Sequence, residues 1–163
     1  MIDPFTQVSR AILAALQADA GWAGMVRAAN VIDMTASSFE RFRTQLQSGD
    51  TPEVILLQEA FALKPFGPSS RIAEMDQALS LIVTHDSLRV CPVNWLKFQT
   101  LIALSKVGPS LGLDGLVRQW QITSGEDDAL GQKHWRRGTQ RWVSVLSIHV
   151  SMTMTREQLA SRS

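Results

Sequence analysis

The feature that most constrains the fold is a two-residue alternation near the C-terminus. Between Arg141 and Thr155, the even positions are almost all apolar: Trp142, Leu146, Ile148, Val150, Met152 and Met154. Many of the positions between them are polar: Ser147, His149, Ser151, Thr153 and Thr155. Only a β-strand with one buried face has this period. At about 3.3 Å per residue such a strand reaches about 50 Å, so we expect part of it to leave the sheet within a long C-terminal hairpin.

Four further segments have strand patterns: Val31–Met34, Glu53–Leu63, Arg71–Thr84 and Leu116–Thr123. The run Val54–Leu57 is apolar throughout, which suits burial on both faces of a sheet. The alternation from Arg71 to Thr84 predicts one face in the core, with Met75, Leu79, Leu81 and Val83, and one solvent-exposed face, with Glu74, Asp76 and Ser80. Prolines and glycine make Lys64–Ser70 a loop, and Ser124–Gly138 is predicted to be a polar connection.

Helical spacing marks two main helices. The first begins with Asp3 as its cap and Pro4 in its first turn, carries the stripe Phe5, Val8, Ile12, Ala15 and Leu16, and ends at Gly21, Trp22 and Gly24. The second, about Val93–Val107, is predicted to be the central packing helix, with an inward stripe of Val93, Leu96, Leu101, Leu104 and Val107 widened by Trp95, Phe98 and Ile102. A capping-box spacing from Ser37 to Glu40 predicts a third, short helix that turns Phe39, Phe42 and Leu46 inward.

These elements predict an α/β protein of the α+β type. We expect a mixed, largely antiparallel sheet of about four strands, with the two main helices packed on it and a long C-terminal hairpin. The chain has 163 residues, 45% of them apolar, and no linker rich in Pro, Gly or Ser, so residues 1–163 should form one domain with a mobile tail from about residue 156.

Composition excludes several functions. The formal charge is +1, which gives no general attraction to nucleic acid or to an anionic membrane. Cys91 is the single cysteine, so an internal disulfide is impossible and a reducing compartment is expected. The sequence has neither a signal-peptide pattern nor a run of about 20 apolar residues, and we expect a protein made in a cytoplasm without a membrane partner.

No motif predicts catalysis. Gly108-Pro-Ser110-Leu-Gly112 matches G-x-S-x-G, but a helix precedes it and a strand follows, the reverse of a nucleophile elbow. Cys91 and His85 lack an orienting third residue, and His85, His134 and His149 have no metal-ligand spacing. Glycine-rich nucleotide loops are also missing. We therefore expect no catalytic residue, no cofactor and no metal, and a solvated or interfacial His149.

A charged segment lies within the last hairpin. Glu126, Asp127 and Asp128 are followed by the basic residues Lys133, Arg136, Arg137 and Arg141. The acidic cluster lacks the ligand spacing of a calcium-binding loop, and the basic cluster is too small for a surface that binds the phosphates of a nucleic acid. Attraction between the two signs on neighbouring copies makes all seven residues candidates for a subunit interface, and a solvated tip is the equal alternative.

The order of elements resembles that of the bacteriophage tail-terminator, or tail-completion, proteins. The similarity rests on the helix Phe5–Leu16, the segment Asp50-Thr-Pro-Glu-Val54 that leads into a strand, the helix Asn94–Val107 and the closing strand Arg141–Met154. It does not extend to Ser37–Leu46 or Ser124–Gly138.

This resemblance implies a non-enzymatic virion protein of the tail and neck, assembled in the host cytoplasm. It implies a homohexamer ring that caps the tail tube, ends its polymerisation and joins the tail to the head connector. The partners would be further copies of the chain, the tail tube protein and the connector, with DNA only as passing cargo in the lumen. A head–tail connector or other neck subunit, and a small cytoplasmic enzyme or ligand-binding domain, remain as alternatives.

Overall fold

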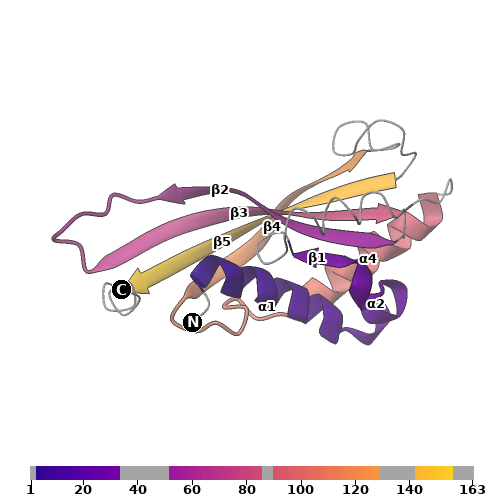
Figure 1. Ribbon diagram of the computed structural model, residues 1–163, viewed down its shortest axis with the longest axis horizontal. Helices are drawn as coiled ribbons and strands as arrows, with labels where there is room; N and C mark the ends of the chain where they lie inside the picture. The colour runs from indigo at the N-terminus through magenta and orange to yellow at the C-terminus, as the bar shows by residue number, and fades with distance from the viewer. Residues whose placement is uncertain (1–2, 34–51, 86–89, 129–141, 156–163) are drawn as a thin grey trace.

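Five strands form one twisted sheet in the order β1-β2-β3-β5-β4 (Figure 1). The computed structural model describes residues 3–33, 52–85, 90–128 and 142–155. The strands are β1 (Val31–Asp33), β2 (Glu53–Leu63), β3 (Ile72–His85), β4 (Val117–Asp128) and β5 (Trp142–Thr155). β1 runs parallel to β2 and all other pairs are antiparallel, which confirms the mixed, largely antiparallel α+β fold. The sheet has five strands where about four were expected, and the segment predicted at Val31–Met34 forms the short edge strand β1.

The helices α1 (Pro4–Ala18), α2 (Ala20–Met25) and α4 (Val90–Ser105) lie on one face of the sheet (Figure 1). α1 forms as the sequence predicts: the Asp3 carboxylate accepts the backbone N–H of Thr6 at 2.9 Å, and Pro4 stands in the first turn. Its stripe Val8, Ile12 and Leu16 is fully buried against the sheet. The predicted helix Ser37–Leu46 and the tail from 156 lie outside the described residues.

Gly21, Trp22 and Gly24 were expected to end the first helix, but they lie inside a second one. α1 stops at Ala18, and Asp19 then caps α2 by accepting the backbone N–H of Trp22 at 2.9 Å. A new helix can start there because the cap satisfies an otherwise unpaired donor and Trp22 gains a buried site. The short turn η1 (Ala28–Asn30) then leads into β1.

β5 stays in the sheet for its whole length, so the expectation that part of it leaves was wrong. Every position from Trp142 to Thr155 pairs with β3, which is equally long at 14 residues. The polar segment Ser124–Asp128 is also strand rather than connection, because its backbone continues the ladder against β5. Backbone hydrogen bonding does not require apolar side chains, and a polar sequence suits an edge strand.

The main core lies between the helices and one face of the sheet, and includes Leu79, Leu81, Ile148 and Met152. The opposite face is polar at one end, where Glu74 is half-buried and Asp76 is exposed, as the alternation predicts. The other end of this face is buried, so the expected exposure of Ser80 was wrong. Ser80 lies there beside a second apolar cluster, which consists of Ile32, Ile55, Ile82, Val143 and Val145. The sheet is therefore buried on both faces at one end, as Val54–Leu57 indicated.

α4 begins three residues earlier than expected and buries only part of the expected stripe. The residues that pack inward are Leu96, Thr100, Ala103 and Leu104. Trp95, Phe98 and Leu101, expected to point inward, are exposed. Apolar residues occur on every side of this helix, so their spacing alone does not show which side faces the sheet. The buried face includes polar Thr100 because its hydroxyl accepts from Trp22 Nε1 at 3.0 Å and donates to the Leu96 carbonyl at 2.7 Å.

Candidate functional site

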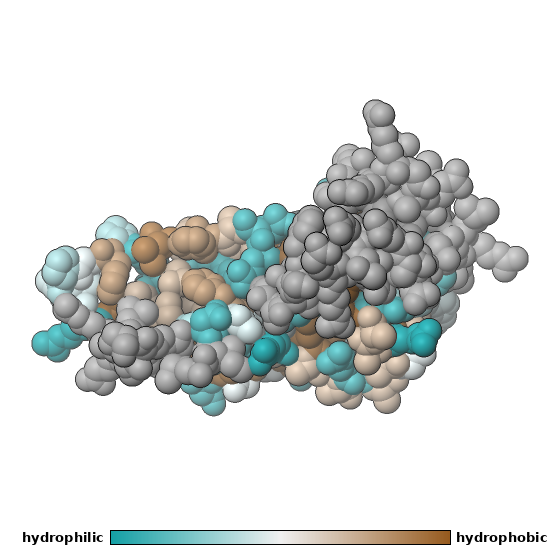
Figure 2. Space-filling view, viewed as in Figure 1, coloured by the Kyte–Doolittle hydropathy of each residue, from teal (hydrophilic) through white to brown (hydrophobic). Residues whose placement is uncertain are grey.

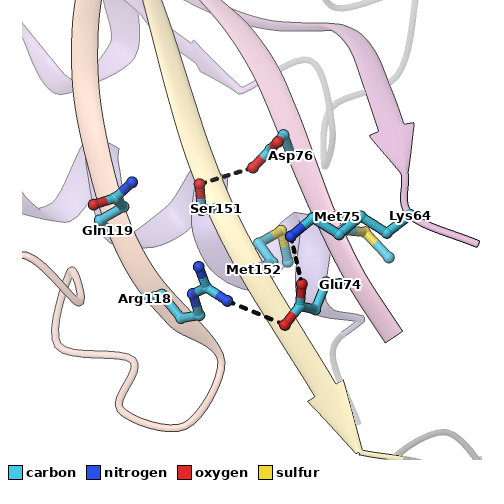
Figure 3. A pocket seen from close by; sticks show the side chains of 8 residues that line it. All are labelled: Lys64, Glu74, Met75, Asp76, Arg118, Gln119, Ser151 and Met152. Atoms are coloured by element: carbon cyan, nitrogen blue, oxygen red, sulfur yellow. Dashed lines mark hydrogen bonds and ion pairs between the residues drawn. The ribbon is translucent and has the colours of Figure 1, made fainter. Parts of the chain in front are cut away.

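A shallow hollow of about 220 Å³ lies at the polar end of the sheet, across β3, β5 and β4 (Figure 3). Its lining consists mainly of polar side chains and two methionines: Lys64, Glu74, Met75, Asp76, Arg118, Gln119, Ser151 and Met152. Lys64 follows β2, so the lining comes from four strands or their ends. The hollow lies beside the loop that joins β2 to β3, on the face opposite the helices.

Glu74 is the centre of a charged network in this hollow. Its two carboxylate oxygens bind Lys64 Nζ at 2.7 Å and Arg118 Nη1 at 3.2 Å (Figure 3). The hydrogen bond from Lys64 holds the pKa of Glu74 below its usual value. Beside it, Ser151 Oγ donates to Asp76 Oδ1 at 2.7 Å. These exposed pairs stabilise the fold weakly, but they tie the loop end of the hairpin to β4 across the sheet.

The hollow has balanced charge. Lys64 and Arg118 face the two carboxylates of Glu74 and Asp76, so an ionic substrate would find no excess of either sign. Among the residues that the structure describes, no group of three His, Cys, Asp or Glu side chains is placed to hold a metal ion. The arrangement is therefore suited to holding the hairpin in place, and to polar contacts with another surface.

The residues considered for catalysis are distributed over the fold. Ser110 lies in a turn in which its carbonyl accepts the Leu113 N–H at 2.8 Å, so the G-x-S-x-G segment is a helix-to-strand connection. His85 ends β3, whereas Cys91 is the second residue of α4, and its side chain is outside the described part. His149 is exposed on the polar face of β5, as the alternation predicts. His134 also lies outside the described residues.

The charged interface candidates are partly described. Glu126, Asp127 and Asp128 form the last residues of β4, whereas Lys133, Arg136, Arg137 and Arg141 lie outside the described residues. Asp127 is engaged within its own chain: Lys97 Nζ of α4 lies 2.8 Å away, and Ser144 Oγ donates to it at 2.8 Å. The bond from Lys97 lowers the pKa of Asp127. An interface role for these seven residues stays a prediction.

The sequence analysis missed two exposed apolar patches. The first, here called the hairpin patch, lies at the end of the β2–β3 hairpin and consists of Phe61, Leu63 and Phe66. Ile72 is also exposed, but the alternation of β3 puts it on the opposite face, with Glu74 and Asp76. Figure 2 shows apolar side chains gathered at this end of the molecule. Phe61 is 66% exposed although its ring lies 6.3 Å from that of Phe5 on α1. Phe61 and Leu63 pair with Gln77 and Met75, so they share the sheet face that the helices cover elsewhere.

The second patch, here called the helix patch, consists of Trp95, Phe98 and Leu101 on α4. Trp95 is 58% exposed and packs edge-on against Phe98, with ring centroids 6.2 Å apart. The signal for this patch was present in the sequence, because α4 has more apolar residues than one buried stripe can use. Exposed aromatic residues at helical spacing are typical of surfaces that bind another protein.

The sequence matches no protein-family model and no curated protein. The fold, in contrast, is similar to that of a chain in a solved structure described as the virion of a native gene transfer agent (GTA) particle. The two chains are 12% identical, the similarity covers 90% of this chain and 95% of that chain, and the TM-score is 0.59. At this identity the likeness shows a shared fold.

Proposed function

We propose that this chain is a structural subunit of a phage-type virion, located at the end of the tail tube. Copies of the chain form a ring, six in number, that stops tube growth and docks the tail to the head connector. The observation that carries the proposal is the fold likeness to a virion chain, because it covers nearly the whole of both chains. The order of elements that resembles the tail-terminator proteins supports the finer position.

The surface of the molecule supports an assembly role. Two apolar patches are exposed, and soluble monomers rarely expose several large apolar side chains together. The hollow on the polar face, with its balanced charge, offers little to bind an ionic substrate. Further copies, the tube protein and the connector are the partners that would cover these patches, while DNA passes through the lumen without specific contacts. None of the described helices is long and apolar enough to cross a membrane.

Electron microscopy of particles made without this chain tests the position. The chain is deleted in the genome that encodes it, and the lysate is imaged by negative stain. A tail terminator predicts filled heads beside unattached tubes of irregular and excessive length. Unattached tails of normal length would instead assign the chain to the head–tail connection. Complete, normal particles would contradict both positions and favour a cellular enzyme or binding domain.

A non-enzymatic role makes a separate prediction. Cys91→Ser and Ser110→Ala should leave particle assembly unchanged, because no residue of the chain acts as a nucleophile. Thermal unfolding is measured for both variants, since a thiol that packs well can affect stability without chemistry. A folded Ser110→Ala protein that no longer supports assembly would contradict the non-enzymatic role.

A further inference from the structure

The hairpin patch and the helix patch lie at opposite ends of the molecule. Figure 1 places the loop between β2 and β3 at one end of the long axis, and the first turns of α4 at the other. One chain therefore presents an apolar surface at each end. A contact that uses both patches at once joins two copies head to tail.

The two patches together are large enough for a specific contact. With roughly 200 Å² for each large apolar side chain, the exposed fractions of Phe61, Leu63 and Phe66 correspond to about 320 Å², and those of the helix patch to about 300 Å². Apolar surface makes up about 60% of a typical interface, so this core corresponds to about 1,000 Å² in total. That area is near the lower limit for specific complexes.

The charges beside the patches do not oppose such a contact. Lys64, next to the hairpin patch, is paired with Glu74, and Lys97, beside the helix patch, is paired with Asp127. The Lys64–Glu74–Arg118 network also fixes the loop end of the hairpin, which lowers the entropy lost when a partner holds it.

We propose that the hairpin patch of one copy binds the helix patch of the next copy, and that this head-to-tail contact closes the ring. The proposal rests on the ring-forming role proposed above and names the surfaces that carry it. A symmetric contact either covers one patch twice and leaves the other exposed, or pairs the two patches in an antiparallel dimer that stops at two copies. A head-to-tail contact covers both on every copy, and it closes when the rotation between neighbours divides a full turn.

Disulfide trapping tests the direction of the contact, because Cys91 is the only native cysteine. In a Cys91→Ser background, one variant carries Leu63→Cys and another carries Phe98→Cys; both sites are exposed, so both proteins should fold. Under mild oxidation each variant alone should remain uncrosslinked, and the mixture should yield a covalent dimer. A chain with both substitutions should yield a ladder of crosslinked species that ends at the ring.

A matched position serves as the control. Gln121→Cys, exposed on the polar face of β4, should give no crosslink with either variant. Crosslinking of Leu63→Cys or Phe98→Cys with itself would indicate a symmetric contact and overturn the proposal. A doubly substituted chain whose crosslinking stops at the dimer would indicate an antiparallel pair and overturn it too. Failure of the mixture to crosslink would overturn it as well.

Sedimentation provides a measurement without cysteines. The double change Phe61→Ser and Leu63→Ser should weaken self-association by roughly 10- to 100-fold, since it removes the largest apolar side chains of the hairpin patch. Gln58→Ser with Glu59→Ser, on the same strand and also exposed, should have little effect.

The two proposals can fail separately. A ring that still assembles with Phe61→Ser and Leu63→Ser, and that shows no crosslink between the patches, overturns the head-to-tail contact but leaves the virion role intact. Normal particles formed without the chain overturn the virion role, while the crosslink still reports on the contact in the purified protein.

Discussion

The buried hydrogen bond between Trp22 and Thr100 should stabilise the junction of α2 with α4 measurably. The Thr100 hydroxyl accepts the indole N–H at 3.0 Å, and both residues are almost completely buried. Thr100→Val replaces the hydroxyl by a methyl group of similar size and leaves the indole N–H without this acceptor. A buried donor that loses its partner costs about 1 to 3 kcal/mol. For a chain of this length, the melting temperature should fall by roughly 3 to 10 °C.

A double-mutant cycle separates this hydrogen bond from packing. Trp22→Phe removes the indole N–H and some apolar volume, and should cost about 1 to 3 kcal/mol alone. In that background Thr100→Val should cost less than about 0.5 kcal/mol, because the hydroxyl then bonds only the carbonyl of Leu96 in its own helix. The expected coupling energy is about 1 to 2 kcal/mol.

Urea unfolding followed by far-UV circular dichroism measures the cycle without relying on tryptophan fluorescence. All four proteins are compared at one low concentration, because self-association would raise their apparent stability. If the two substitutions add within about 0.5 kcal/mol, the hydrogen bond makes no net contribution and the reasoning is refuted.

Three other perturbations test separate parts of the structure. Asp19 accepts hydrogen bonds from Lys106, the Trp22 backbone and Gln99, which lower its pKa to about 2. Its contribution to stability is therefore complete above pH 3.8 and is lost as the pH falls toward 2. Asp19→Asn should flatten the profile of melting temperature against pH in that range. Gly115→Ala should cost about 1 kcal/mol in urea unfolding because φ is +82° there, whereas Gly108→Ala, with open space around it, should cost little. Reversing Arg136 and Arg137 to Glu should leave the monomer's circular dichroism unchanged but weaken the ring in sedimentation, if the charged segment contacts a neighbour.

Caps, apolar stripes and alternations within a few residues predicted the elements whose structure depends on their own sequence. The cap at Asp3, the stripe along α1 and the alternation in β5 each require one conformation, and all three were confirmed. The apolar run Val54–Leu57 likewise predicted a strand that is buried at both faces, as Val54, Ile55 and Leu56 are. These patterns act over a few residues, so no knowledge of tertiary contacts is needed to interpret them.

Tertiary contacts decided the features that sequence patterns did not predict. α4 is apolar on all sides, so only its packing against α2 and the sheet selects Leu96 and Thr100 for burial and leaves Trp95 and Phe98 exposed. The helical start at Ala20 depends on Asp19, whose carboxylate also accepts from Lys106 at 2.6 Å, 87 positions along the chain. The polar hollow combines side chains from segments distant in sequence, which no spacing rule could bring together.

One prediction about the exposed hairpin could have been made from lengths alone. At about 3.3 Å per residue the 14 residues of β3 span about 46 Å, whereas at about 1.5 Å per residue the 15 residues of α1 span about 22 Å. A helix of this length, even when aligned with the strands, covers about half of the sheet. β5 carries Ser and Thr on its solvent face, but β2 carries Phe61 and Leu63 at the end of the helical layer, beside the first turn of α1, on the face that the helices cover elsewhere. The excess of strand over helix therefore creates an apolar surface that the described part of the chain leaves exposed, and burial of that surface by a neighbouring copy would stabilise the assembled state.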